Sequence, residues 1–234
     1  MAAEQLIFEL APDATPSFAN FLPGANVEVI AHLRALAAGE LRETSVAVWG
    51  AAGSGKSHLA RAVIDASVMP ARSLDVEAED VPEIAGEALF AVEGVDRLSA
   101  LAQGRLFTLY NLCREQGAHL LLTSSVPPQQ STLRDDLRTR VGWGLVLELK
   151  PLADRDKPAA LAAYADEQGF RLPAEVIAFL LSHVRRDMGN LLSIVRALGR
   201  HSLATKRPVT VPLARDLLQP GIALETRASD GSER

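Results

Sequence analysis

One eight-residue stretch constrains the fold more than any other part of this chain of 234 residues. The sequence GAAGSGKS, residues 50–57, has the spacing G-x-x-x-x-G-K-S. It follows a short apolar run, SVAVW, and it opens a segment, 56–67, whose apolar residues have helical spacing. In that context the pattern predicts a phosphate-binding loop between a strand and a helix. We therefore expect an α/β protein.

Each residue type in this loop has a physical reason to hold phosphate. Glycines let the backbone wrap around an anion, and the N–H groups of the loop and of the helix N-terminus point at it. Lys56 is expected to pair with β- and γ-phosphate oxygens, and the Ser57 hydroxyl to ligate Mg²⁺. The sequence thus predicts binding of ADP or ATP with Mg²⁺, and the predicted loop residues are Gly50, Ala51, Ala52, Gly53, Ser54, Gly55, Lys56, Ser57 and His58.

A carboxylate at the end of another predicted strand is expected to complete the site. Glu93 ends the apolar run 88–93, and it would hold Mg²⁺ through water; a solvated strand-end acid is the alternative. The next residue is Gly94, which cannot polarise an attacking water. Asp96 can replace that acid only if the turn bends it back. The polar end of the strand 118–125, formed by Thr123, Ser124 and Ser125, lies where a γ-phosphate sensor would, although strand ends are often polar anyway.

Short apolar strands alternate with helical patterns through the middle of the chain. This alternation predicts a parallel five-stranded sheet covered on both faces, with strands at 45–50, 71–77, 87–94, 118–125 and 144–150. After Pro151 strand signals nearly vanish, and amphipathic helices are expected at 154–169, 173–186, 188–206 and within 209–219. We therefore expect an N-terminal segment 1–15, an α/β nucleotide-binding subdomain 16–151, a helical lid 152–220 and a disordered tail 221–234.

Composition excludes several classes of protein. The net charge of −5 argues against a dedicated nucleic-acid binder. No apolar run approaches the roughly 20 residues that span a bilayer, and the N-terminus lacks the basic region of a secretory signal. The single cysteine, Cys113, is expected to pack in the core and is typical of a cytosolic protein. We expect a cytoplasmic protein with no membrane contact.

Taken together, the order of these motifs resembles the DnaA-type AAA+ ATPases, the bacterial replication initiators and their relatives. The similarity runs over about residues 18 to 218, and LRTRVGWG (137–144) is similar to the S-R-[FL]-x-W-G segment of that family. The implied fold is a AAA+ P-loop NTPase core plus a small C-terminal all-helical lid. The resemblance implies that Arg140 is an arginine finger acting in trans; a surface arginine at a helix end is the alternative, and Arg138 lies two residues away.

The resemblance also implies that the segment 16–29 encloses the adenine. Its matching residues are Phe18, Phe21, Gly24 and Asn26, with plain core packing as the alternative for the two phenylalanines. Initiators of this family carry a C-terminal DNA-reading domain, whereas this chain ends soon after the predicted lid. We therefore expect no direct sequence-specific DNA binding.

The start of the chain selects a branch of the family. QLIFEL, residues 5–10, resembles the sliding-clamp-binding peptide that opens the Hda proteins, the regulatory inactivators of DnaA; a short edge strand is the alternative. The implied partners are DnaA and the DNA polymerase III sliding clamp (its β subunit), at the nucleoid and replisome. Self-association into a homo-oligomer is left open. The clamp-binding residues would be Gln5, Leu6, Phe8 and Leu10.

Two departures from the family pattern concern hydrolysis. Gly94 follows Glu93, and Gly189 stands about where the family has a lid sensor arginine; Arg186 could serve only if its helix is continuous with the next. Both departures favour weak or absent intrinsic ATPase activity, so we expect a regulator that stimulates hydrolysis of DnaA-bound ATP and prevents re-initiation. The alternatives are an independent P-loop ATPase, or a DnaA-like adaptor that anchors a partner without a finger.

Overall fold

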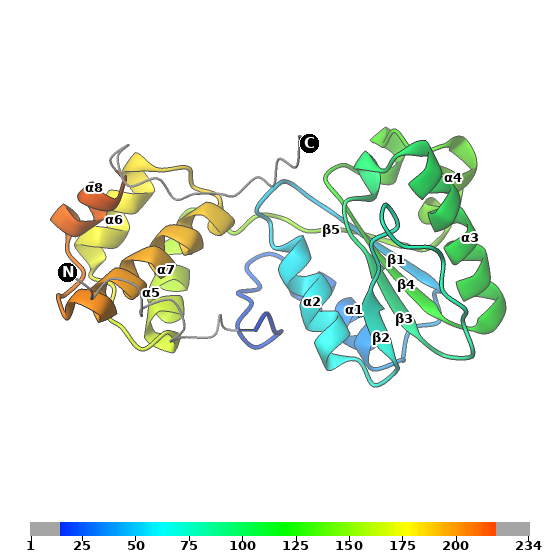
Figure 1. The fold of residues 1–234 in the computed structure, drawn as a ribbon, viewed down its shortest axis with the longest axis horizontal. Helices are drawn as coiled ribbons and strands as arrows, with labels where there is room; N and C mark the ends of the chain where they lie inside the picture. The colour runs from blue at the N-terminus through cyan, green and yellow to red at the C-terminus, as the bar shows by residue number, and fades with distance from the viewer. Residues whose placement is uncertain (1–14, 219–234) are drawn as a thin grey trace, which may run out of the picture.

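The computed structural model describes residues 15–218, which form an α/β part and a helical part side by side along the long axis of the molecule (Figure 1). The α/β part is built on a five-stranded sheet with strand order β2-β3-β4-β1-β5, and every neighbouring pair of strands is parallel. The strands are β1 (Ser45–Trp49), β2 (Ala71–Ser73), β3 (Leu89–Val92), β4 (His119–Ser124) and β5 (Leu145–Glu148).

Helices cover both faces of this sheet because side chains alternate along each strand. Leu121 points to the face covered by α1 (Val27–Ala37) and α2 (Lys56–Ala66). Its neighbours Leu120 and Leu122 point to the opposite face, which α3 (Ala100–Gln116) and α4 (Asp135–Trp143) cover. The near-continuous apolar strands of the sequence are explained by this double burial.

A separate apolar core holds the helical part together. It is built from α5 (Lys157–Glu167), α6 (Ala174–His183), α7 (Met188–Thr205) and α8 (Val211–Leu218). Gly199 of α7 lies under the ring of Phe170, where an added Cβ would come within 2.4 Å of the ring. The proposed boundary near residue 151 lies in the connection 149–156 between β5 and α5.

Most expected elements are confirmed, and three differ. The strand predicted at 71–77 ends at Ser73, because the chain turns at 75–79, where the N–H groups of Ala78 and Glu79 both donate to the Asp75 carbonyl. Helices α1 and α4 were not anticipated. The predicted adenine-enclosing segment 16–29 overlaps only the start of α1, and α4 has charged residues at four of its first six positions.

Two further expectations concern packing and membranes. Cys113 is fully buried against the sheet, and burial raises the pKa of its thiol to about 12, so it stays a packing residue. Within residues 15–218 no helix has both the length and the apolar character to cross a membrane. The clamp-binding prediction and the tail prediction fall on 1–14 and 219–234, outside the described residues.

Candidate functional site

The predicted phosphate loop leaves the carboxyl end of β1 and enters α2. The Gly50 N–H donates to the carbonyl oxygen of Ser124 (3.2 Å), which ties the loop to the end of β4. A Cβ on Gly50 would lie 2.3 Å from the Leu149 carbonyl oxygen. Gly53 and Gly55 have φ values of +74° and +101°, which side-chain-bearing residues rarely adopt. The glycines of the motif are therefore required by this backbone.

Lys56 is held against the same loop. Its Nζ donates to the carbonyl oxygens of Gly50 (2.7 Å) and Ala51 (2.9 Å). Burial lowers the pKa of Lys56, while the nearby Asp96 raises it, Arg97 lowers it and Glu93 raises it; the net direction is down. The lysine thus lies within electrostatic reach of three charged residues at the end of β3.

The loop fits a phosphate-bearing ligand. Ser54 Oγ is buried beside Gly50 and has no hydrogen-bond partner in the part of the chain that the structure describes. Ser57 Oγ donates directly to a Glu93 carboxylate oxygen, so the first turn of α2 and the end of β3 meet. A hydroxyl beside a carboxylate is the donor pair that suits Mg²⁺ bound together with phosphate oxygens. Within residues 15–218 no group of three or more His, Cys, Asp or Glu is placed to hold a metal.

Phe21 and His58, two of the predicted nucleotide residues, lie together at this loop. A Cβ on Gly55 would lie 2.6 Å from Phe21 Cε2, so the ring rests on the loop glycine. The Phe21 and His58 ring centroids are 5.4 Å apart, and His58 Nε2 lies 2.9 Å from the Ser17 carbonyl oxygen. The segment before α1 is thereby fastened to the start of α2.

The other predicted adenine residues serve different contacts. Phe18 lies beneath the guanidinium of Arg34, 5.5 Å from its ring centroid, and packs on the core under α1 and α2. The buried amide of Asn26 donates to the Lys150 carbonyl (2.9 Å) and accepts from the Lys150 N–H (2.8 Å). Gly24 packs against Leu152, with 3.1 Å from its would-be Cβ to the Leu152 side chain. Asn26 and Gly24 therefore tie this segment to the connection toward the helical part.

The turn after Glu93 bends back toward the end of β4. Gly94 has φ +67°, and its N–H donates to Thr123 Oγ1 (3.1 Å). The Asp96 carboxylate accepts the N–H of Ser125 (3.0 Å). Burial raises the pKa of Asp96, but hydrogen bonds from Ser125 outweigh it, so the carboxyl stays below its usual range. The turn therefore bends Asp96 back to the end of β4, which is what a role for Asp96 in place of the missing acid requires. Thr123 accepts the hydrogen bond from Gly94 in the same turn.

The helical part reaches the phosphate loop through a residue that the sequence did not indicate. Asp187 caps α7 by accepting the Asn190 N–H (2.9 Å), and its Cβ lies 2.8 Å from the would-be Cβ of Gly53. A helix-capping aspartate was readable from the sequence, but its contact with Gly53 depends on tertiary packing. The condition set for Arg186 fails, because α6 ends at His183 and α7 begins at Met188; Arg186 pairs instead with Asp154 (2.9 Å).

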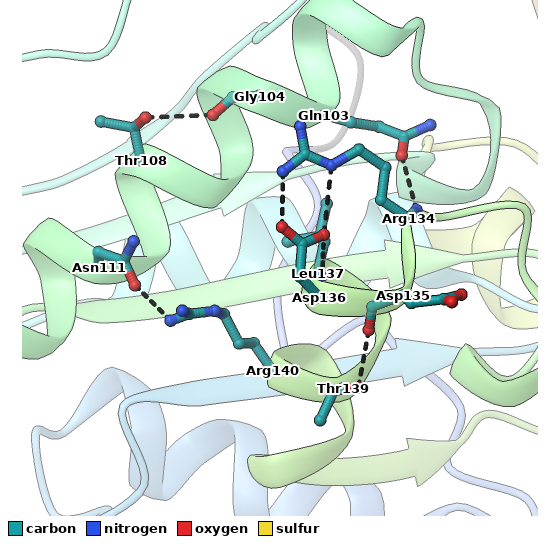
Figure 2. A network of polar contacts seen from close by, with 10 residues as sticks. All are labelled: Gln103, Gly104, Thr108, Asn111, Arg134, Asp135, Asp136, Leu137, Thr139 and Arg140. Atoms are coloured by element: carbon teal, nitrogen blue, oxygen red, sulfur yellow. Dashed lines mark hydrogen bonds and ion pairs between the residues drawn. The ribbon is translucent and has the colours of Figure 1, made fainter.

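Arg140 lies on α4, at half burial, and is held by α3 (Figure 2). Its Nη1 donates to Asn111 Oδ1 (2.5 Å), and its guanidinium stacks 4.2 Å from the centroid of the Phe107 ring. Arg138 is separate, because it pairs with Asp135 (2.6 Å) on the helix surface. We call Phe107, Asn111 and Arg140 the finger surface, and the loop 50–57 with Glu93 the nucleotide cradle.

The cradle and the finger surface lie on different faces of the sheet and near opposite ends of its strands. The cradle is at the carboxyl ends of β1 and β3, on the side of α2. Arg140 is on the side of α3 and α4, and α4 runs toward the amino end of β5, where Gly144 packs on the backbone of Ser45. Strand β1 begins at Ser45, so this is the edge of the sheet opposite the phosphate loop.

Comparison with known proteins agrees with this architecture. Residues 154–218 match the family model described as the lid domain of Hda. Domain III of the replication initiation protein DnaA from Thermotoga maritima is similar in structure, with a TM-score of 0.71 and 21% identity over 89% of this chain and 98% of that one. AMPPCP-bound DnaA from Aquifex aeolicus has a TM-score of 0.64 and 18% identity, over 83% of this chain and 69% of that one. A Thermotoga maritima RuvB mutant has a TM-score of 0.67 and 14% identity, over 86% of this chain and 71% of that one.

The parallel sheet, the phosphate loop and the helical lid make up the AAA+ P-loop fold. Within that class the lid is the more specific part, because it matches the lid of Hda over its whole described length. The chain therefore has the fold of DnaA domain III, and its residues 154–218 match the lid domain of Hda.

Proposed function

We propose that this protein is a regulatory inactivator of DnaA. It binds ADP or ATP with Mg²⁺ in the cradle, docks on the DNA-loaded sliding clamp through Gln5, Leu6, Phe8 and Leu10, and presents Arg140 to the nucleotide site of ATP-bound DnaA. Hydrolysis there switches the initiator off and prevents re-initiation. The relation of the lid to Hda supports DnaA as the partner.

The location of Arg140 is the observation that carries this proposal. The finger surface lies across the sheet from α2 and toward the edge opposite the phosphate loop. This location, away from the chain's own phosphate loop, supports a role for the guanidinium at a site on another molecule. Trp143, which ends the same helix, is 64% exposed, and exposed Trp and Arg side chains commonly anchor protein interfaces. A finger in trans is worth roughly 10³–10⁵ in rate in well-studied GTPases.

The cradle has a different task in this proposal. Bound nucleotide with Mg²⁺ supplies a polyphosphate charge that the loop N–H groups, Lys56 and the Ser57–Glu93 pair hold in place. Gly94 offers no carboxylate to polarise water, and Gly189 offers no lid arginine. Adenine nucleotide in this site therefore supports the shape of the protein, with weak or absent turnover of its own. The relative described as AMPPCP-bound DnaA supports an adenine nucleotide as the ligand.

A hydrolysis assay on ATP-loaded DnaA tests the proposal. The purified protein should accelerate hydrolysis only when clamp is present on DNA. Arg140→Ala should lower the acceleration at least about 100-fold, within the range of finger losses, and leave the affinities for ADP and clamp unchanged. Arg138→Ala, two residues away on the same helix, is the matched control and should act like the wild type. Gln5→Ala should weaken docking on the clamp, so that adding clamp on DNA no longer accelerates hydrolysis of DnaA-bound ATP. Full acceleration by Arg140→Ala would show that the finger assignment is wrong.

A further inference from the structure

The turn that follows Glu93 places a guanidinium where the side chain of residue 94 would project. Gly94 is left-handed, and the short 3-10 helix η1 (Val95–Arg97) closes with a hydrogen bond from Arg97 N to the Gly94 carbonyl (3.0 Å). A Cβ on Gly94 would lie 2.9 Å from Arg97 Nη2 and 3.5 Å from its Nε. Arg97 therefore lies over Gly94, in the space that a longer residue at position 94 would use.

This guanidinium has no ion pair or side-chain hydrogen bond within residues 15–218. The lack of a partner is notable because carboxylates surround it. Arg97 lines a hollow of about 450 Å³ together with Asp75, Glu77 and Glu93. Two other arginines nearby, Arg72 and Arg105, do form ion pairs, with Glu79 and Asp80.

The carboxylates nearest to Arg97 are each engaged by other groups. Glu93 accepts from Ser57 Oγ, and Asp96 accepts from the Ser125 N–H. Glu77 accepts from both the N–H (2.6 Å) and the hydroxyl (2.7 Å) of Ser99. An exposed, unpaired guanidinium among occupied acids is arranged for an anion that comes from outside the chain.

The cradle is the source of such an anion. Glu93, the neighbour of Gly94, bonds directly to Ser57 of the loop. The charge of Arg97 is also felt at Lys56, where it lowers the pKa of the ammonium group. Arg97 thus lies at the end of β3, beside the carboxylate that Ser57 of the phosphate loop contacts.

We infer that Arg97 binds the terminal phosphate of the nucleotide held in the cradle. The positively charged guanidinium of Arg97 lies where an acidic side chain at position 94 would project. A guanidinium can pair with two phosphate oxygens at once, which a carboxylate cannot do. An arginine there retains the phosphate and does not activate water. The inference rests on the proposed nucleotide-binding role of the cradle and adds a residue that contacts the end of the polyphosphate.

Titration calorimetry with AMPPCP, ADP and AMP, each with Mg²⁺, tests this assignment. Arg97→Gln should weaken AMPPCP about tenfold, which is 1.4 kcal/mol, weaken ADP less, and leave AMP unchanged. Arg97→Lys should lie between Arg97→Gln and the wild type, because an ammonium keeps the charge and loses the bidentate geometry. Arg42→Gln, an exposed arginine before β1 at the opposite edge of the sheet, is the control and should bind all three ligands normally.

Each other outcome is decisive. An equal loss for AMPPCP, ADP and AMP would mean that Arg97 only supports the turn, and no loss would also overturn the inference. If Arg97→Gln melts early, Gly94→Asn replaces it, since asparagine tolerates a left-handed φ and displaces the guanidinium; the same graded loss is then expected. If the wild type binds no nucleotide, the proposed nucleotide-binding role of the cradle is wrong. If the wild type binds nucleotide, Lys56→Ala abolishes that binding and Arg97→Gln leaves it intact, then only the inference about Arg97 is wrong.

Discussion

The nucleotide cradle and the finger surface are built by opposite means. Backbone conformation forms the cradle: Gly50, Gly53 and Gly55 allow positions that a Cβ would close, and Lys56 bonds to the loop's own carbonyls. Side chains form the finger surface, where Asn111 and the Phe107 ring fix one guanidinium. Under the proposed function the two regions are complementary halves of a hydrolytic site, and in one chain they lie on different faces of the sheet. The proposed function therefore requires a second molecule to bring such halves together.

Loss of the cradle should have the largest effect and should leave the finger surface intact. Lys56→Ala removes charge-assisted hydrogen bonds that are worth about 1.5–3 kcal/mol each, so the Kd for ADP should rise roughly 100-fold. Fluorescence titration with a labelled adenine nucleotide measures this change. Lys150→Ala is the control, since only the backbone of Lys150 is bonded to Asn26.

The separation of the two regions can be tested on the same Lys56→Ala variant. Hydrogen exchange in α3 and α4 should match the wild type, because these helices pack on the other face of the sheet from α2. A loss of protection around Asn111 and Arg140 would show that the finger surface depends on the cradle, and that the two regions are not independent.

Much of the cradle was predictable because its determinants are local in sequence. The spacing GAAGSGKS between a strand and a helix specifies the loop, and the strand end at Glu93 follows from the apolar run before it. Double burial makes the strands of a parallel sheet visible as apolar runs. The strand β2 was overestimated for a related reason: Leu74 and Val76 continue the apolar pattern and are buried, but they pack in the core after the ladder has ended.

The features that sequence reasoning missed depend on contacts between distant segments. The role of Arg97 is visible only once the left-handed Gly94 turns the chain back. The approach of Asp187 to Gly53 joins residues from the two parts of the molecule. Asn26 keeps its predicted role at the adenine as a prediction, and its amide is bonded to both backbone groups of Lys150, a pairing that the sequence did not indicate. No local pattern encodes such pairings, because they depend on how the elements pack.

A smaller effect, confined to the finger surface, is expected from Asn111→Ala. The change removes the oxygen that accepts from Arg140 Nη1 and leaves the Phe107 stack in place. A half-exposed hydrogen bond to a charged group is worth about 1 kcal/mol after solvent screening, so acceleration of DnaA hydrolysis should fall about fivefold. The Kd for ADP should not change, which titration calorimetry can establish.

Thr108→Ala on the same helix is the control for Asn111→Ala. Within residues 15–218 the Thr108 hydroxyl bonds only to the Gly104 carbonyl one turn earlier, so acceleration should stay at the wild-type level (Figure 2). If Asn111→Ala also weakened ADP binding, the finger surface and the cradle would be coupled through the sheet, and the view of two independent regions would be wrong.

The smallest effect concerns the contact between Asp187 of the helical part and Gly53 of the cradle. Asp187→Ala removes the N-cap of α7 and the carboxylate beside Gly53. Loss of a cap costs about 1 kcal/mol, so amides in the first turn of α7 should exchange faster. Asp187→Asn separates the two roles, because asparagine caps a helix as well as aspartate does and carries no charge. If the carboxylate repels bound phosphate, Asp187→Asn should keep the protection of α7 and tighten ADP binding by less than about threefold, as expected for a screened surface charge. Unchanged ADP affinity in both variants would mean that this contact is packing alone.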